Sequence, residues 1–228
     1  MTWTQTTRAQ YRRDGLRYAR DMTDVEWVLI EPYLPSPCRL GRPREVVLRA
    51  VLDGILFVLR SGCQWRMLPK DYPPRSTVQR YFYRWRELGL WAQINHALLM
   101  QVREAAGRQG SPSAGIIDSQ SVKTTESGGP KGYDAGKQVS GCKRHSVTDT
   151  MGFLVGLLVH TADIQDRDGA VPLLASIRRS FPWLRHVFAD GGYAGPKLRA
   201  AMAQPGHWTL QIVKRSDQTT GFVVLPRR

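Results

Sequence analysis

The chain has 228 residues, 42% of them hydrophobic, and its 33 lysines and arginines outnumber 19 acidic residues, for a formal net charge of +14. No apolar run is long enough to cross a bilayer, and the N-terminus lacks the apolar stretch of a secretory signal, so no membrane partner is expected. Three separated cysteines without a Cys-x-x-Cys pair argue against a disulfide framework or a zinc site and favour a cytoplasmic setting.

The basic excess is spread along the whole chain, with a net charge of +8 over residues 1–110 and +6 over residues 111–228. A basic tail would have concentrated this charge in one segment. A charge of this size repels itself within a compact fold, which favours contact with a polyanion over a merely soluble basic surface. Nucleic acid is therefore the first partner that we expect.

The first part of the chain predicts a basic arm followed by helices. Residues 1–21 are polar and carry five arginines, which indicates an arm that is loosely ordered unless bound. Thr23 and Glu26 form a capping-box pattern ahead of an apolar face, which predicts a helix within residues 23–34. A second helix is expected at 44–60, where Ser61-Gly62 ends it. A third is expected to begin with Ser76 as its cap, and a fourth is expected at 90–106. The sequence therefore predicts a helical domain over residues 22–106.

The helix that opens near Ser76 places arginines among aromatic residues, in the stretch RSTVQRYFYRWRE. Its candidate DNA contacts are Arg75, Arg80, Arg84 and Arg86. This pattern favours a helix-turn-helix-like DNA-binding domain. An ordinary helical bundle, with the aromatic residues in its core and the arginines on a solvated face, explains the pattern equally well.

The pattern changes after residues 107–114, which are rich in glycine and serine and are interpreted as a linker. Over residues 115–228 the expected elements are a strand at 115–122, a glycine-rich loop at 126–142, a hairpin of 143–150 and 153–160 around Met151-Gly152, a helix at 168–180 with Pro172 in its first turn, a strand at 186–190, a helix at 195–203 and a strand at 208–214. This order predicts an α/β (α+β) domain with a mixed sheet flanked by helices.

Two aspartates stand on predicted strands, where propensity and burial both disfavour a carboxylate. Asp118 interrupts an apolar strand, and Asp190 ends the strand HVFAD and is followed at once by two glycines. Carboxylates on central strands of one sheet could converge on Mg²⁺, which prefers oxygen ligands, and two such ions would stabilise in-line attack on a phosphodiester. The glycines would then leave room for DNA. For Asp190 alone, the simpler interpretation is the cap of a turn.

These stretches resemble the DDE transposases of bacterial insertion sequences, specifically the family named after insertion sequence five. In the second part of the chain the resemblance is carried by IIDSQSVKT, GYDAGKQVSGCKRHSVTDTMGFLVGLLVHTADIQDRDGA and FADGGYAGPKLRA. In the first part it is carried by TDVEW, LGRPR, LRSGCQWRMLPKDYPP and STVQRYFYRW. The resemblance covers nearly the whole chain, and the combined motifs are highly specific.

The resemblance implies a ribonuclease-H-like catalytic domain behind a helical DNA-binding domain. It implies that Asp118 and Asp190 are the first and second catalytic acids and bind the metal cofactor, Mg²⁺ or Mn²⁺. The expected chemistry is hydrolytic nicking at the terminal inverted repeats of double-stranded DNA, followed by attack of the freed 3′-hydroxyl on target DNA. The resemblance also implies a nucleoid-associated protein that can form a homodimer in its DNA complex.

The resemblance ends before the third catalytic acid, which in the family is a glutamate on a helix after a segment like GFVVLPRR. This chain stops with that segment at Arg228, and its final glutamate is Glu126. Asp217 stands in a polar loop and is not expected to replace the glutamate. We therefore expect impaired cleavage, and whether the chain is an enzyme stays open. The alternative is a catalytically inactive DNA-binding fragment or an inhibitor of transposition.

Basic residues near the Asp118 strand are candidate phosphate contacts, namely Lys123, Lys143, Arg144 and His145. A solvated strand end explains them equally well. The acids Asp163, Asp166 and Asp168 could form a second metal cluster. Their position at the start of a predicted helix, where the helix dipole favours negative charge, makes capping the expected role.

Overall fold

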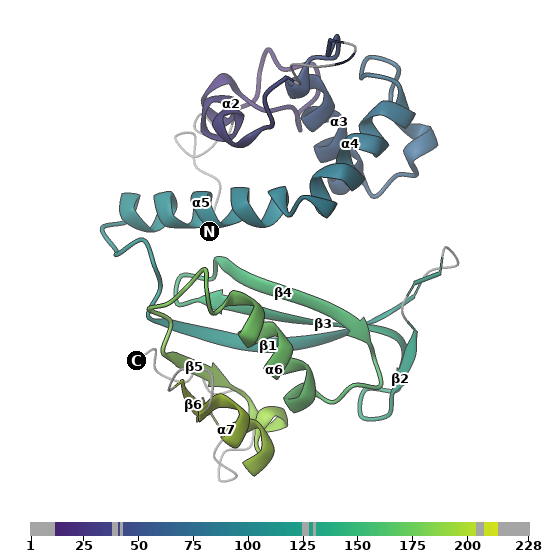
Figure 1. The fold of residues 1–228 in the computed structure, drawn as a ribbon. Helices are drawn as coiled ribbons and strands as arrows, with labels where there is room; N and C mark the ends of the chain where they lie inside the picture. Colours follow the sequence, from purple (N-terminus) through teal and green to yellow (C-terminus); the bar gives the residue numbers. More distant parts are fainter. Residues whose placement is uncertain are drawn as a thin grey trace. The chain divides into compact units, whose positions relative to one another are not determined.

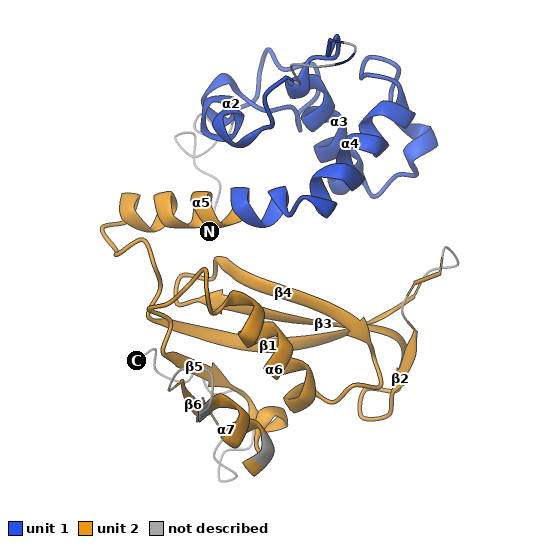
Figure 2. Cartoon of the chain, in the orientation of Figure 1, with its two compact units in different colours: residues 1–94 blue, residues 95–228 orange. Residues whose placement is uncertain are grey.

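The computed structural model describes residues 12–37, 41, 43–124, 128–129, 131–203 and 208–213. The chain divides into two compact units, residues 1–94 and 95–228, which are described separately (Figure 2). Among the described residues, no helix is long and apolar enough to cross a membrane.

The division between the units lies inside helix α5 (Leu90–Ala105), whereas the sequence predicted a linker at 107–114. The reason is found in the second half of α5. Leu99 belongs to the core of the sheet unit, and Arg103 forms a buried ion pair with Asp149. These contacts tie the end of α5 to the second unit by burial, which the helical spacing of the sequence did not reveal.

The described part of the first unit contains α2 (Asp24–Ile30), α3 (Leu48–Ser61), α4 (Arg75–Glu87), the start of α5, and the 3-10 helices η1 (Glu31–Tyr33) and η2 (Trp65–Met67) (Figure 1). The predicted capping box is confirmed, because Thr23 accepts the N–H of Glu26 and Glu26 accepts the N–H of Thr23. The predicted end of α3 is also confirmed, since Gly62 adopts the left-handed conformation there, with a φ of 68°.

Helices α3 and α4 pack through fully buried apolar residues, among them Val51 and Ile55 of α3 and Val78 of α4. Two details differ from the sequence prediction. Helix α4 begins at Arg75 after Pro74, so Ser76 lies within its first turn and does not cap it. Residues 62–74 separate α3 from α4, a connection much longer than the three to four residues of a helix-turn-helix. The unit is therefore helical as predicted, but α3 and α4 lack that motif's short turn.

Residues 12–21, the described part of the predicted arm, pack on the helical unit instead of lying loose. The guanidinium of Arg13 donates to both carboxylate oxygens of Glu26, at 3.1 and 2.6 Å. Asp21 is buried and accepts a hydrogen bond from the Tyr72 hydroxyl at 2.5 Å. The remainder of the arm lies outside the described residues.

The second unit is built on a mixed sheet of β1 (Ala114–Lys123), β2 (Gly132–Asp134), β3 (Val139–Asp149), β4 (Leu154–Thr161), β5 (His186–Ala189) and β6 (Thr209–Ile212). Strand β3 pairs antiparallel with β1, β2 and β4, whereas β5 pairs parallel with β1 and with β6. The hairpin of β3 and β4 and the mixed sheet confirm the predicted fold class.

Two elements of this unit differ from their predictions. Strand β2 and the first residues of β3 lie within 126–142, which the sequence predicted as a glycine-rich loop, because pairing between β2 and β3 stabilises segments that have no apolar pattern of their own. Helix α6 (Asp166–Ile177) begins before the predicted position 168, so Pro172 lies in the helix interior. Proline has no N–H, and the helix therefore lacks one internal hydrogen bond at that point.

The core of the second unit lies between the sheet and α6, which runs across one face of the strands, with α7 (Pro196–Ala203) beside it (Figure 1). Leu173 and Leu174 of α6 pack in one apolar cluster with Ile117, Val147 and Val187 of the strands. Because successive strand residues face opposite sides, the residues between these apolar positions face the other side of the sheet.

Candidate active site

The two predicted acids come from neighbouring parallel strands. Ile116 of β1 and Phe188 of β5 form the last pair of these two strands, and Asp118 and Asp190 each lie two residues beyond it. Asp190 directly follows the last residue of β5, and both aspartates are exposed. Within the described part of the chain, no ion pair involves either of them. The fold therefore places both carboxylates, neither in an ion pair among the described residues, just beyond the same end of one parallel strand pair.

Asp190 also caps a turn, as the simpler interpretation of the sequence held. One of its carboxylate oxygens accepts the N–H of Gly192 at 3.0 Å and begins the 3-10 helix η3 (Gly191–Tyr193). A Cβ added at Gly191 would meet nothing within 4 Å, so space is open at this turn. Capping leaves the second carboxylate oxygen available, because an ionised carboxylate offers about four lone-pair sites.

The donor chemistry of the pair fits a hard divalent cation. Mg²⁺ is typically bound by one or two protein carboxylates, with water and phosphate oxygens completing its shell. Among the described residues, no group of three or more histidine, cysteine or acidic side chains gathers to hold a metal ion. Asp217 lies outside the described residues. Asp118 and Asp190 thus suit a site that is completed by substrate phosphate or by further ligands.

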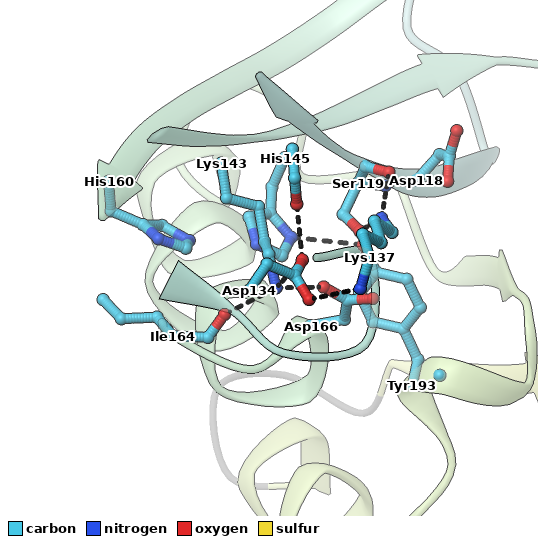
Figure 3. Close-up of polar contacts among 12 residues, drawn as sticks. Asp118, Ser119, Asp134, Lys137, Lys143, His145, His160, Ile164, Asp166 and Tyr193 are labelled. Carbon is cyan, nitrogen blue, oxygen red and sulfur yellow. Dashed lines mark hydrogen bonds and ion pairs between the residues drawn. The ribbon is translucent and has the colours of Figure 1, made fainter. Parts of the chain in front are cut away.

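A polar cluster with a buried centre lies near Asp118, between the sheet and α6 (Figure 3). We call it the Lys143 cluster, and it consists of Ser119, Asp134, Lys143, His145, His160, Asp166 and Tyr193. The Lys143 ammonium lies 3.2 Å from Asp134 and 3.0 Å from Asp166, and it donates to the carbonyl of Ile164 at 2.8 Å. Burial by itself would lower the pKa of Lys143, but the bonds to Asp166 and Asp134 outweigh burial and raise it. The ammonium is therefore charged and structural.

Tyr193 connects the Lys143 cluster to the acid pair. It is 1% exposed, and its hydroxyl lies 3.1 Å from Nδ1 of His145. Burial, together with the negative charges of Asp166, Asp118 and Asp190, raises the pKa of Tyr193. The neutral hydroxyl therefore lies within electrostatic reach of both predicted catalytic acids.

The burial of β3 residues corrects two predicted DNA contacts. Lys143 and His145 are 4% and 0% exposed, so neither can reach a phosphate on a duplex. They face α6, whereas Arg144, between them, faces the opposite side of the sheet, is exposed and donates to the side chain of Gln120. Lys123, at the end of β1, is exposed as well. Arg144 and Lys123 stay predicted phosphate contacts.

The acids near the start of α6 lie where the sequence predicted them. Asp166 and Asp168 lie in the first turn, where the dipole favours them, although the N-cap itself is Gln165 and makes no side-chain cap bond. Asp166 is engaged by Lys143, so it contributes to the Lys143 cluster and does not form a separate site with Asp163.

Protonation of His145 is expected to destabilise the protein as the pH falls from about 6.5 to 4. Burial, aided by His160, Lys143 and Lys137 and opposed by Asp166, lowers the pKa of His145 to about 4 from an ordinary 6.5. In that window the unfolded chain binds the proton before the folded chain does, so the free energy of unfolding decreases as the pH decreases. Urea unfolding at pH 7 and pH 5 measures this loss.

His145→Gln should lose less stability between pH 7 and pH 5 than the wild type. His186→Gln is the matched control, because His186 is an exposed histidine of β5. Equal losses in the wild type and in His145→Gln would contradict the prediction.

Sequence reasoning missed Asp134, Tyr193 and Lys137 as members of this region. Local signals existed for the first two. Asp134 opens the stretch DAGK, which is typical of a turn that an aspartate side chain closes, and Tyr193 is the aromatic residue of DGGY next to Asp190. For Lys137 nothing in the local sequence indicates proximity to β1, because pairing between distant strands brings it there.

The predicted DNA-contacting arginines lie on the exposed side of α4. Val78 and Trp85 bury the opposite side of this helix in the core. The exposed residues include all four candidates, Arg75, Arg80, Arg84 and Arg86. The guanidinium of Arg86 lies over the ring of Tyr83, 4.9 Å from its centroid. The structure thus gives α4 a cationic, solvent-facing surface that could receive a polyanion.

Comparison with known proteins places both units among transposases. Residues 22–95 match the family model described as "Putative transposase of IS4/5 family", and residues 109–228 match the one described as "Transposase DDE domain". The "Insertion element IS402 uncharacterized 16.2 kDa protein" of Burkholderia cepacia is 36% identical over 121 residues, which cover 48% of this chain and 78% of that protein. "Uncharacterized protein y4sN" of Sinorhizobium fredii (strain NBRC 101917 / NGR234) is 34% identical over 92 residues, which cover 40% of this chain and 66% of that protein.

Proposed function

The chain belongs to the DDE transposases of the IS4/5 type, and from this premise we propose that it binds and cleaves the inverted-repeat ends of a bacterial insertion element. The proposal is supported by the parallel pairing of β1 with β5, since the exposed Asp118 and Asp190 each lie two residues beyond its last pair. Pairing of two chains on two ends, and joining of the freed 3′-hydroxyl to target DNA, belong to the same proposal.

In this proposal Asp118 and Asp190 hold Mg²⁺ or Mn²⁺. A divalent metal bound there would supply charge stabilisation for the attacking and leaving oxygens of the phosphodiester. The chain itself keeps the two carboxylates in place. Asp118 is fixed by β1, whose neighbours are β3 and β5, and Asp190 is fixed by its bond to the N–H of Gly192. Two anchored carboxylates lose little freedom when a metal binds, which favours a defined geometry.

The proposal is tested with the purified chain and a duplex that carries the end of its element. We expect single-strand cuts that leave a 3′-hydroxyl, formed with Mg²⁺ or Mn²⁺ and abolished by EDTA. A duplex of unrelated sequence is the control and should stay intact. Specific binding of end DNA without any cleavage at saturating Mg²⁺ or Mn²⁺ would overturn the catalytic part of the proposal.

Replacing Arg80 and Arg84 by glutamine is expected to weaken binding of end DNA. Each lost phosphate contact should reduce the slope of log affinity against log salt concentration by about 0.9. Fluorescence anisotropy between 50 and 300 mM KCl, a range over which such contacts lose most of their strength, measures this slope with a precision on the order of tenths. Arg199→Gln, an exposed arginine of α7, is the matched control, and an equal slope in all three proteins would contradict the proposed role of α4.

A second candidate function is DNA binding without catalysis, as in an inhibitor that occupies the element ends. It is favoured by one observation, that the candidate arginines of α4 are exposed, because a surface that binds a polyanion requires no catalytic metal. This candidate predicts that end binding survives Asp118→Asn and Asp190→Asn and that no condition yields cuts. The cleavage experiment above separates the two candidates.

A further inference from the structure

Lys137 lies beside the strand that carries Asp118, although 18 positions separate Lys137 from Ser119. Its ammonium donates to the carbonyl oxygen of Ser119 at 3.2 Å and to the Ser119 hydroxyl oxygen at 3.3 Å (Figure 3). Ser119 directly follows Asp118 in the chain. Lys137 is itself an exposed residue, and no acidic side chain forms an ion pair with it in the described part of the chain. A positive charge is thus held at Ser119, the residue that follows the proposed catalytic acid, and remains open to solvent.

The turn that carries Lys137 is built from buried and constrained groups. Asp134, at the end of β2, accepts the backbone N–H of Lys137 at 3.1 Å, the Ser121 hydroxyl at 2.5 Å and the Lys143 ammonium at 3.2 Å. Gln138, the next residue, has a φ of 54°, in the left-handed region that a side chain disfavours. Such a conformation is strained and persists only where the surroundings determine it. The hydrogen bonds of Asp134 before Lys137 and the backbone conformation of Gln138 after it therefore fix the position of Lys137.

An ordinary solvated lysine would be free to sample many rotamers, and fixing one of them costs side-chain entropy. Here the ammonium is instead directed to Ser119. Its field also reaches Asp166, where burial raises the pKa of the carboxyl but hydrogen bonds from Lys143 and Ser119, aided by the charges of Lys143 and Lys137, lower it overall. A DNA strand that approaches Asp118 and Asp190 would be repelled by their carboxylates, and a fixed cation bound to Ser119, the residue after Asp118, would offset part of that repulsion. A lysine ammonium binds phosphate oxygens as a compact point charge.

We propose that Lys137 is a substrate-binding residue of this site that contacts the phosphate of the DNA strand held at Asp118 and Asp190. This inference rests on the proposed function. In it, Lys137 takes no part in proton transfer and forms no bond to the metal. Its role is to hold a phosphate oxygen, so that the strand lies across the two carboxylates in one position.

The test compares Lys137→Gln with Lys131→Gln, an exposed lysine just before β2. Binding of end DNA in EDTA is measured first, because it does not require cleavage. We expect the salt slope of log affinity to fall by about 0.9 in Lys137→Gln and to stay unchanged in Lys131→Gln. Unchanged thermal unfolding of both variants excludes a folding defect.

Cleavage with Mn²⁺ gives the second measurement. We expect kcat to fall on the order of 10²-fold in Lys137→Gln, which is the typical loss when one fixed charge-stabilising group is removed. We expect Lys137→Arg to recover most of this loss. Mn²⁺ binding to the free protein should not weaken, because the loss of a nearby positive charge removes a repulsion on the metal cation. Equal salt slopes in Lys137→Gln and the wild type would overturn the inference. A wild type that binds end DNA but never cuts would instead overturn the catalytic function and leave the binding result to decide on Lys137.

Discussion

Asp190→Asn is expected to lower the rate of metal-dependent DNA cleavage by about 10³-fold or more, and Asp118→Asn should have an effect of the same order. Asparagine keeps the size of the side chain but removes its charge. One neutral amide and one carboxylate would then remain where two carboxylates had held a divalent cation. The rate is measured with end DNA under saturating Mn²⁺.

The fold should tolerate both substitutions, which makes the loss of cleavage interpretable. Asp118 and Asp190 are exposed, and the hydrogen bond from Gly192 can be accepted by the amide oxygen of an asparagine as well. Circular dichroism and the thermal midpoint should therefore match the wild type, and end DNA should bind at least as tightly, because each substitution removes a negative charge that repels the strand. Asp163→Asn is the matched control, since Asp163 is an exposed aspartate of the same unit outside the pair.

The double variant sharpens this prediction. If Asp118 and Asp190 hold one metal site together, either single change disables the site, and the double change should be hardly worse than each single one. Mn²⁺ titration, followed by the electron paramagnetic resonance signal of free Mn²⁺, should show weaker binding in all three variants. Independent, multiplicative losses or unchanged Mn²⁺ binding would contradict a shared metal site.

Lys143→Met is expected to lower the free energy of unfolding by about 3–5 kcal/mol. The side chain of Lys143 is 5% exposed and lies between the carboxylates of Asp134 and Asp166. Methionine fills similar volume but leaves both carboxylates without their cation, and uncompensated buried charge is strongly destabilising. Urea unfolding at pH 7 measures the loss, with Lys123→Met as the control, because Lys123 is exposed at the end of β1.

The pH dependence of this loss follows from Asp134. The hydrogen bond from Ser121, opposed by burial and aided by Lys143, lowers the pKa of Asp134 to about 2 from an ordinary 3.8. A depressed folded-state pKa contributes stability that is complete above about pH 3.8 and is lost as the pH falls toward 2. Without Lys143 the carboxylate of Asp134 should protonate at a higher pH than in the wild type, so the difference in unfolding free energy between Lys143→Met and the wild type should narrow as the pH falls from about 3.8 toward 2. A gap that is constant over this range would contradict the ion-pair explanation.

Local sequence determined most elements of the chain. The capping box of Thr23 and Glu26, the glycine stop at Gly62 and the hairpin turn at Gly152 all depend on residues close in sequence, and each was predicted correctly. The same holds for the mixed order of strands and helices, which follows from apolar periodicity. Asp118 and Asp190 could be singled out because a carboxylate is conspicuous on an apolar strand.

Only the tertiary structure decided which side of each strand is buried. Residues 143–145 of β3 alternate, and the sequence shows the alternation but not which face α6 covers, so Lys143 and His145 were expected at the surface. The position of α6 depends on the path from β4 to β5 and on the apolar contacts of the whole sheet. Likewise, Lys137 reaches Ser119 only through strand pairing across the sheet. Periodicity is a local property, whereas burial depends on long-range packing, and the neighbours of the two acids were therefore set by the fold alone.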